Sequence, residues 1–217
     1  MSPLPPHPHP RLITFDVFGT ILDWQRGMTD DVRAAGRSMG ASDFERVVNR
    51  QAELERDRTF RPYRDITAAS LIVEMGLDPD AAKAIGADVG RWPAFPDCAP
   101  ALRRLMRVAP CVAMTNSDVE HGRQAQAGLG FQLSGWVCAE EVQVYKPAQG
   151  FWHAVSRKFL VGPGPDWWHV SAYADYDGDV ARALGLTAVF VERPHARPGP
   201  SSLVVRDLLA LADLVEA

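Results

Sequence analysis

Residues 12–20 read Leu-Ile-Thr-Phe-Asp-Val-Phe-Gly-Thr, a short apolar run that ends in a lone carboxylate and continues into Gly-Thr. A parallel central strand has this character, because helices cover both of its faces. Ligands of open α/β sheets bind outside the carboxyl ends of the strands, so we expect Asp16 to lie where chemistry occurs. Gly19 permits a tight turn there, and Thr20 supplies a hydroxyl. This stretch alone equally allows an Asp that only caps the next turn or helix.

Four further short apolar runs predict strands, and they alternate with segments that have helical periodicity. The runs lie at residues 111–114, 136–138, 168–171 and 188–191. Alternation of strands and helices predicts parallel βαβ units with right-handed crossovers. The predicted fold class is therefore α/β, a Rossmann-like doubly wound parallel sheet.

The segment after the first predicted strand is rich in Arg, Asp, Glu and Ala and contains no convincing strand. Ser-Asp-Phe-Glu at residues 42–45 fits a capping box that opens a helix. Pro79 fits the first position of another helix, where its missing N–H costs nothing. These features predict an all-helical insertion.

The predicted domain boundaries follow from these changes in composition. A Rossmann-like core would comprise residues 11–21 and 96–217, with the small helical insertion at residues 22–95. Residues 1–10 alternate Pro with His and Ser, which denies the backbone regular pairing and predicts a flexible extension. His7 and His9 in that extension could bind a metal only weakly.

Composition and charge exclude several classes of protein. The chain has 217 residues, of which 47% are hydrophobic and 23% charged, enough for one core and a smaller subdomain. Its formal charge of −4 provides no basic field for nucleic acid. Three widely spaced cysteines indicate reduced thiols, and the apolar runs are far shorter than the ~20 residues of a membrane span. We expect a cytoplasmic protein with neither nucleic-acid nor membrane partners.

Polar residues follow three of the later predicted strands. Because the carboxyl ends of parallel strands meet at one edge of a sheet, we expect these residues to lie close to Asp16. Such a convergence of a carboxylate, a cation and further polar side chains is suited to covalent catalysis. Each residue alone could instead be a helix cap or a solvated surface charge. The residues are Thr115 and Asn116, Lys146, and the acidic residues Asp175, Asp177 and Asp179.

Taken together, these motifs resemble the four motifs of the haloacid dehalogenase superfamily, an Asp nucleophile, a Ser/Thr, a Lys and an acidic loop. The likeness covers nearly the whole chain from Leu12 and is greatest to the (S)-2-haloacid dehalogenase (type II) branch. It implies that residues 22–95 form a helical cap domain over the active site. Most phosphatases of the superfamily carry a second Asp two residues after the nucleophile. That position is Phe18 here, and a phenyl ring cannot donate a proton.

The resemblance implies hydrolytic dehalogenation of a small 2-haloalkanoic acid to a 2-hydroxy acid, without a cofactor. Asp16 would displace the halide and form an aspartyl ester, which water then hydrolyses. Lys146 would keep Asp16 ionised and oriented, and Thr20 would lie in the same catalytic group. Asp177 is the expected general base, with Asp175 as the alternative. The partners implied are a small carboxylate substrate and the released halide, and a homodimer is compatible with the family.

The resemblance also implies substrate-binding roles. Thr115 and Asn116 would hold the substrate carboxylate. Arg50 lies in Arg-Gln-Ala-Glu-Leu-Glu at residues 50–55, which is similar to the cap-helix segment that supplies a halide-binding Arg. Periodicity alone favours a solvated helix face for Arg50. An apolar wall that excludes water from the reacting carbon would comprise Phe18, Trp24, Phe60 and Trp152.

Two positions depart from the dehalogenase pattern. Ala172 and Ala174 stand where the dehalogenases have a Ser and an Asn that help to hold the Lys and the water, which suggests a subgroup with a rearranged fourth motif. The main alternative is an Mg²⁺-dependent phosphatase in which Asp175 or Asp177 binds the metal. Two others are the opening of a small strained ring in a carboxylic acid by the same ester chemistry, and a non-enzymatic interaction protein on a decayed fold.

Overall fold

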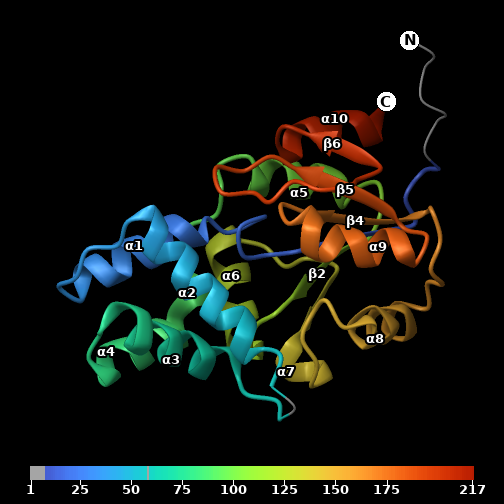
Figure 1. Ribbon diagram of the computed structural model, residues 1–217. Helices are drawn as coiled ribbons and strands as arrows, with labels where there is room; N and C mark the ends of the chain where they lie inside the picture. The colour runs from blue at the N-terminus through green and yellow to red at the C-terminus, as the bar shows by residue number, and fades with distance from the viewer. Residues whose placement is uncertain (1–7, 58) are drawn as a thin grey trace.

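The computed structural model of the protein describes residues 8–57 and 59–217, and Figure 1 shows its arrangement. Six parallel strands form one sheet in the order β3-β2-β1-β4-β5-β6. This arrangement confirms the predicted doubly wound parallel α/β fold. The strands are β1 (Leu12–Phe15), β2 (Cys111–Thr115), β3 (Gly135–Cys138), β4 (Trp167–Ser171), β5 (Thr187–Val191) and β6 (Leu203–Val205).

Strand β1 lies at the centre of the sheet because all four of its side chains are buried. Its last residue, Phe15, pairs with Ala113 of β2 on one side and with Val170 of β4 on the other. The carboxyl ends of three neighbouring strands therefore lie at one edge, and Asp16 is the next residue of the chain. Strand β6 was not predicted, because it has only three residues and lies at the edge of the sheet, where two of them are not buried.

Helices cover both faces of the sheet (Figure 1). Right-handed crossovers place α5 and α6 on one face and α8 and α9 on the other. Helix α10, which was not predicted, packs against α5. The helices of the core are α5 (Cys98–Leu105), α6 (Val119–Leu129), α7 (Ala139–Val142), α8 (Gln149–Phe159), α9 (Asp179–Ala183) and α10 (Leu208–Glu216).

The segment between β1 and α5 is helical, as predicted, and Figure 1 shows its helices gathered to one side of the sheet. The predicted capping box is displaced, because Gly40 rather than Ser42 is the N-cap of α2 and its N–H donates to the Asp43 carboxylate. Pro79 is the first residue of α4, as predicted. Among the described residues of this insertion, the helices are α1 (Trp24–Ala34), α2 (Ala41–Leu54), α3 (Tyr63–Met75), α4 (Pro79–Asp88) and the 3₁₀ helix η1 (Val89–Arg91).

Asp118 fastens the insertion to the core. Its buried carboxylate accepts hydrogen bonds from the N–H groups of Tyr63 and Arg64, at 2.7 and 3.0 Å. The first N–H groups of a helix have no partner within the helix. A carboxylate there accepts their hydrogen bonds and is attracted by the partial positive charge of the helix N-terminus. This contact holds the start of α3, and with it the Tyr63 ring, close to the carboxyl ends of the strands.

Two expectations from the sequence were that the cysteines are reduced thiols and that no segment spans a membrane. Cys98, Cys111 and Cys138 are buried free thiols. Burial raises the pKa of Cys111 to about 12, which keeps that thiol protonated. No helix in residues 8–57 and 59–217 combines the length and apolar character that a membrane crossing requires.

Candidate active site

A buried ammonium joins two carboxylates at the carboxyl edge of the sheet. Nζ of Lys146 donates to Oδ1 of Asp16 at 2.9 Å and to Oδ2 of Asp177 at 2.6 Å. Lys146 and Asp177 are almost fully buried, and Asp16 is 8% exposed. The structure therefore brings together three residues that are 130 and 31 positions apart in the sequence, as the strand-end argument predicts.

Asp16 is held from both sides. Oγ1 of Thr20 donates to its Oδ2 at 2.7 Å, while the N–H of Ala172 donates to the Thr20 hydroxyl at 3.0 Å. The turn between them needs Gly19, which has φ +87°, and a Cβ there would lie 2.7 Å from the Tyr173 ring. Each carboxylate oxygen of Asp16 thus has one fixed donor.

Asp177 presents one bonded and one free oxygen. It lies in a single π-helical turn, Ala174–Gly178, that follows β4. Oδ2 receives Lys146 and also lies 3.3 Å from Nε2 of His169. Oδ1 is buried and has no hydrogen-bond partner in the described part of the chain. A buried carboxylate oxygen without a donor is able to accept a proton from a water molecule in the pocket.

The three charges shift one another's protonation. Burial raises the pKa of Asp16 and the Asp177 charge adds to this, although Lys146 opposes both. Burial acts in the same direction on Asp177, but Lys146 and His169 outweigh it and the pKa of Asp177 is lowered. Burial would lower the pKa of Lys146, yet the two carboxylates raise it, so the ammonium stays charged. Asp177 is consequently the carboxyl that ionises more readily.

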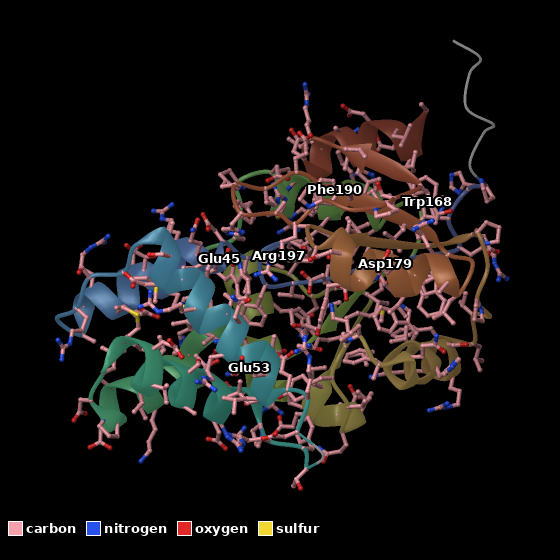
Figure 2. All side chains as sticks on the ribbon, viewed as in Figure 1. Glu45, Glu53, Trp168, Asp179, Phe190 and Arg197 are labelled. Atoms are coloured by element: carbon pink, nitrogen blue, oxygen red, sulfur yellow. The ribbon has the colours of Figure 1, made fainter. Side chains whose placement is uncertain are left out.

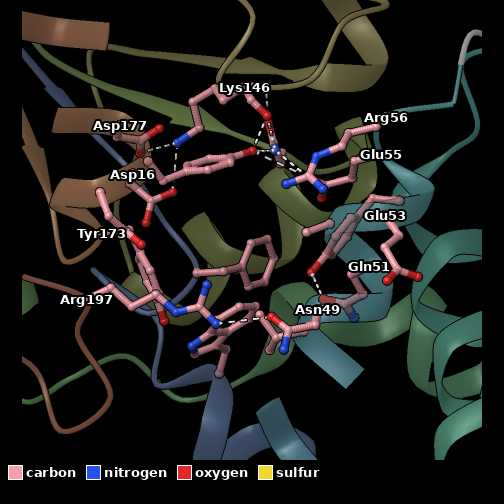
Figure 3. Close-up of a pocket in the computed structure, with 18 residues that line it drawn as sticks. Asp16, Asn49, Gln51, Glu53, Glu55, Arg56, Lys146, Tyr173, Asp177 and Arg197 are labelled. Atoms are coloured by element: carbon pink, nitrogen blue, oxygen red, sulfur yellow. Dashed lines mark hydrogen bonds and ion pairs between the residues drawn. The ribbon is translucent and has the colours of Figure 1, made fainter. Parts of the chain in front are cut away.

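A pocket of about 540 Å³ lies above these residues, between the core and the insertion (Figure 3). Its volume is typical of small-molecule sites. Phe18 forms part of its wall, with the Phe18 ring packed edge-on against Trp92 and tilted against Tyr63. Residues from α2, from the first turns of α1 and α3, and from the loops of the core line it. Among them are Asp16, Phe18, Trp24, Asn49, Gln51, Glu55, Arg56, Tyr63, Asn116, Lys146, Tyr173, Asp175, Tyr176, Asp177 and Arg197.

Asn116 links the insertion to the core at one end of the pocket. Its Nδ2 donates to Oε2 of Glu55 at 3.0 Å and to the Tyr176 hydroxyl at 2.7 Å. Its Oδ1 accepts from the N–H of Lys146 at 2.7 Å. Glu55 ends helix α2, and burial raises its pKa to about 8. This carboxyl therefore stays protonated up to a higher pH than an ordinary Glu does.

Arg50 does not line the pocket, contrary to the expectation from the sequence. Its guanidinium pairs with Glu53 at 2.8 Å and with Glu74 of α3 at 3.3 Å. The neighbours Asn49 and Gln51 do line the pocket. Successive helix residues point about 100° apart, so Arg50 is directed along the flank of α2, where acidic partners hold it.

Arg197 is the arginine that the core contributes to the pocket. Its Nη2 donates to Glu45 at 2.8 Å and lies 3.5 Å from Oδ1 of Asn49, both on α2 (Figures 2 and 3). Its backbone pairs with Ala172 and Ala174, on either side of Tyr173. The sequence offered no sign of Arg197, because it lies in the irregular segment between β5 and β6.

Three other predicted residues lie elsewhere than expected. Trp152 is 1% exposed and its ring packs against His169 behind the site, so it does not line the pocket. The Thr115 hydroxyl is fully buried, has no partner among the described residues and does not line the pocket either. Phe60 stacks on Tyr145 and lines a neighbouring cavity. Trp24 does line the pocket, as predicted for the apolar wall.

The two candidate bases differ in their surroundings. Asp175 lines the pocket but is exposed. Its partial burial raises its pKa by more than the charge of Arg197 lowers it. Asp177 is buried and bonded to Lys146. His169, which the sequence analysis overlooked, contacts only Asp177 of the two. The geometry favours Asp177 as the base.

Comparisons with known proteins bear on the fold. No protein-family model matches the sequence, and no curated protein matches it. Among solved structures, an L-2-haloacid dehalogenase is 23% identical with a TM-score of 0.81, over 94% of this chain and 98% of that one. The L-2-haloacid dehalogenase from Xanthobacter autotrophicus with chloropropionic acid covalently bound is 17% identical with a TM-score of 0.82, over 95% and 98%.

The magnesium-bound protein YfnB from Bacillus subtilis is also similar, at 13% identity and a TM-score of 0.79, over 96% of this chain and 100% of that one. At these identities the likeness establishes a shared fold. It confirms the Rossmann-like α/β architecture expected from the haloacid dehalogenase resemblance. A dehalogenase and a magnesium-bound protein both share it, so the reaction has to be inferred from the side chains of the site.

Proposed function

We propose that this protein is a hydrolase of the haloacid dehalogenase superfamily that converts a 2-haloacid to a 2-hydroxy acid through an aspartyl ester. The observation that carries the proposal is the arrangement around Lys146. One buried ammonium holds Asp16 and Asp177, while Oδ1 of Asp177 remains free to accept a proton. Such a site supplies both a fixed nucleophile and a separate base.

In the first half-reaction an Asp16 oxygen attacks the halogen-bearing carbon. The new C–O bond forms as the carbon–halogen bond breaks, and the halide leaves with the bonding pair. Lys146 and Thr20 orient Asp16 through hydrogen bonds of 2.9 and 2.7 Å. No proton needs to move in this step, so a halide can be displaced without an acid at the position of Phe18.

In the second half-reaction water hydrolyses the ester. Oδ1 of Asp177 accepts a proton from the water as its oxygen attacks Cγ of Asp16. The bond between Cγ and the substrate oxygen then breaks, and the departing alkoxide takes the proton back from Asp177. The Asp16 acid loses its proton to solvent and is again a carboxylate. The lowered pKa of Asp177 keeps this base ionised before each turnover.

We further propose that the insertion acts as a cap and that the substrate anion is held between cap and core. Arg197 and Asn116 both line the pocket, and both bond to residues of α2 or its end. A guanidinium suits a carboxylate or a departing halide, so Arg197 takes the part that the sequence suggested for Arg50.

The magnesium-dependent phosphatase is the weaker alternative. A divalent ion would be held by oxygens of Asp16 and Asp177, but the Lys146 ammonium already takes one oxygen of each, at 2.9 and 2.6 Å. Phe18 also cannot protonate the alcohol that leaves a phosphate ester. A reaction without a cofactor accords with this site.

Release of halide from 2-chloroacids tests the proposal. The purified protein is assayed with chloroacetate, 2-chloropropionate and a longer 2-chloroacid, each with and without EDTA, and with p-nitrophenyl phosphate plus Mg²⁺. We expect halide and 2-hydroxy acid in equal amounts, unaffected by EDTA. Hydrolysis of the phosphate ester that EDTA abolishes, without halide release, would support the phosphatase. Inactivity on every substrate would contradict the proposal.

A further inference from the structure

His169 is a buried polar residue in the middle of a central strand. It lies on β4 opposite Thr14 of β1 and is 1% exposed. Its Nε2 is 3.3 Å from Oδ2 of Asp177, and its Nδ1 is 2.9 Å from Oγ1 of Thr14. A histidine that only fills the core would need no such pair of polar neighbours. It does not line the pocket, so any part it plays in the reaction passes through Asp177.

The imidazole ring is fixed on three sides. Thr14 holds one nitrogen, Asp177 faces the other, and the Trp152 ring packs against the imidazole with ring centroids 5.8 Å apart. The Thr14 hydroxyl is itself held, because Nε1 of Trp167 donates to it at 2.8 Å. The aromatic residues of α8 and β4 therefore serve as supports for this ring.

The same contacts favour one imidazole nitrogen as the carrier of the proton. The Trp167 indole can only donate, so the Thr14 oxygen accepts there and retains its own proton to donate. Its nearest acceptor is Nδ1 of His169 at 2.9 Å, closer than the Trp168 carbonyl at 3.3 Å. With Nδ1 as acceptor, Nε2 carries the imidazole proton, and this nitrogen faces the Asp177 carboxylate.

We propose that His169 is a positioning residue for the hydrolytic half-reaction, holding Oδ2 of Asp177 so that Oδ1 stays directed at the water. The inference rests on the proposed ester mechanism. Both neighbours of Asp177, Lys146 and His169, approach Oδ2, which leaves Oδ1 free. Lys146 donates a hydrogen bond to Oδ2, and the His169 ring contacts the same oxygen at 3.3 Å without completing a hydrogen bond, so the two neighbours together restrain this side of the carboxylate.

The role of His169 grows once the ester has formed. In the resting site Lys146 lies between two carboxylates, and its position is defined by both. Esterification removes the negative charge of Asp16, so Lys146 loses one of its two anionic partners. Asp177 is then the one anionic partner of Lys146, and the ammonium is no longer positioned from the Asp16 side. The contact of His169 with Asp177 does not involve Asp16, so the first half-reaction leaves it unchanged. Loss of His169 should therefore slow ester hydrolysis while ester formation is largely preserved.

Single-turnover kinetics on His169→Phe, His169→Gln and His121→Phe test the proposal. His121 of α6 is a matched control because it is equally buried at 1% exposure. Its ring nitrogens bond to the N–H of Asp118 and to the carbonyl of Gly86 rather than to Asp177. The rates of ester formation and ester decay are followed with a 2-chloroacid by intact-protein mass spectrometry. Urea unfolding reports the stability of each variant.

We expect His169→Phe to slow ester decay roughly 10- to 100-fold with ester formation within about threefold of wild type. His169→Gln, which keeps a donor, should recover part of the decay rate. His121→Phe should lose stability without accumulating ester. If His169→Phe does not fold, Thr14→Val removes the hydroxyl that fixes the ring, and it should slow decay selectively but less.

Three results would overturn the inference. One is wild-type ester decay in folded His169→Phe or Thr14→Val. Another is an equal slowing of both steps, because that indicates a general structural role. The third is a wild-type protein that forms no ester with any 2-haloacid, which contradicts the proposed function itself. The first two leave ester formation by the wild type intact, so failure of the inference can be told apart from failure of the proposed function.

Discussion

The buried charges beneath the pocket and the charges at its rim are built differently. Below, Asp16, Lys146 and Asp177 all come from the core, with side chains at most 12% exposed and contacts of 2.6–2.9 Å. At the rim, Arg197 of the core meets Glu45 of the insertion with both side chains at least 36% exposed (Figure 2). The reactive groups are thus fixed by one rigid sheet, whereas the groups suited to substrate recognition depend on contact between core and insertion.

This difference predicts unequal responses to mutation. A buried ion pair adds little net stability, but removing one partner leaves an uncompensated charge in a medium that solvates it poorly. Exposed pairs are screened by water and salt and contribute little. Changes below the pocket should accordingly cost both stability and chemistry, and changes at the rim should alter mainly substrate binding.

The largest effect is expected for Lys146→Ala. It leaves Asp16 and Asp177 buried without their shared cation, so the free energy of unfolding should fall by about 3–5 kcal/mol and turnover by at least roughly 10³. The stability loss should shrink at acidic pH, where the carboxylates protonate. Urea unfolding at several pH values measures this loss of stability.

The control is Lys158→Ala, whose pair with Glu141 is 43% exposed on both sides. This variant should change stability by less than about 1 kcal/mol. Equal losses in both variants would contradict the distinction.

Asp177→Asn should slow ester hydrolysis by on the order of 10²–10⁴ while ester formation continues, because the amide cannot accept the proton from water. Intact-protein mass spectrometry should then show the substrate minus halide bound to the protein, and peptide mapping should place it on Asp16. Asp175→Asn is the matched control, since its carboxylate is exposed and lies outside the Lys146 pair. Accumulation of ester in Asp175→Asn instead would move the base two residues upstream.

Arg197→Ala should lower kcat/KM for a 2-chloroacid by roughly 10- to 100-fold, since it removes the guanidinium that the core directs into the pocket. Arg197→Lys should lie in between, because an ammonium lacks the planar donor fork. Arg50→Ala should stay within about twofold of wild type, as Glu53 and Glu74 hold its guanidinium outside the pocket. Steady-state kinetics on the three variants measure this. The reverse order would restore Arg50 as the anion-binding residue.

The smallest effect is expected for the pH dependence of stability at Glu55. Burial raises its pKa from 4.5 to about 8, so the folded state binds the proton more tightly than the unfolded chain does. Its contribution to the free energy of unfolding is complete below pH 4.5 and is lost as the pH rises through 8. Between pH 5 and 9 the free energy of unfolding of the wild type should fall by roughly 2 kcal/mol relative to that of Glu55→Gln. One pKa unit corresponds to ~1.4 kcal/mol, and water that reaches the carboxyl screens it and makes the effect smaller than the full shift would give.

Urea unfolding across that pH range provides the measurement. Glu53→Gln is the control, because Glu53 is 59% exposed in its pair with Arg50, and it should follow the wild-type pH dependence. If Glu55→Gln retains that dependence too, the carboxyl at the end of α2 is solvated and charged like an ordinary Glu.

The sequence predicted the central features of the fold because they depend on local pattern. Apolar runs such as residues 12–15 have few alternatives to a buried parallel strand, and the residues after such strands must meet at one edge. This reasoning located Asp16, Lys146 and Asp177. It did not find β6, because a three-residue edge strand has no distinctive pattern. It also did not find α10, although Asp207 precedes a leucine-rich run and caps the helix.

The residues that sequence reasoning misplaced depend on side-chain direction or on tertiary contact. Arg50 follows a pocket residue in α2, and a single helical step turns it toward Glu74. Trp152 looks like a substrate wall by its position after Lys146, but it packs against His169 inside the core. His169 could have been noticed in the sequence, since it is a polar residue at the centre of a buried strand. In the sheet it pairs with another polar residue, Thr14 of β1. Arg197 left no signal in the sequence, because only the folded chain brings its segment to the pocket.

The most direct test of the account is the source of the oxygen in the product of a first turnover. Excess enzyme is mixed with a 2-chloroacid in water enriched in ¹⁸O, and the hydroxy acid and the peptide that contains Asp16 are analysed by mass spectrometry. If Asp16 is the nucleophile, the first product carries unlabelled oxygen from the carboxylate, and ¹⁸O appears in the Asp16 peptide because water attacks Cγ. Label in the first product with an unlabelled Asp16 peptide would show that water attacks the substrate directly, and it would contradict the ester mechanism.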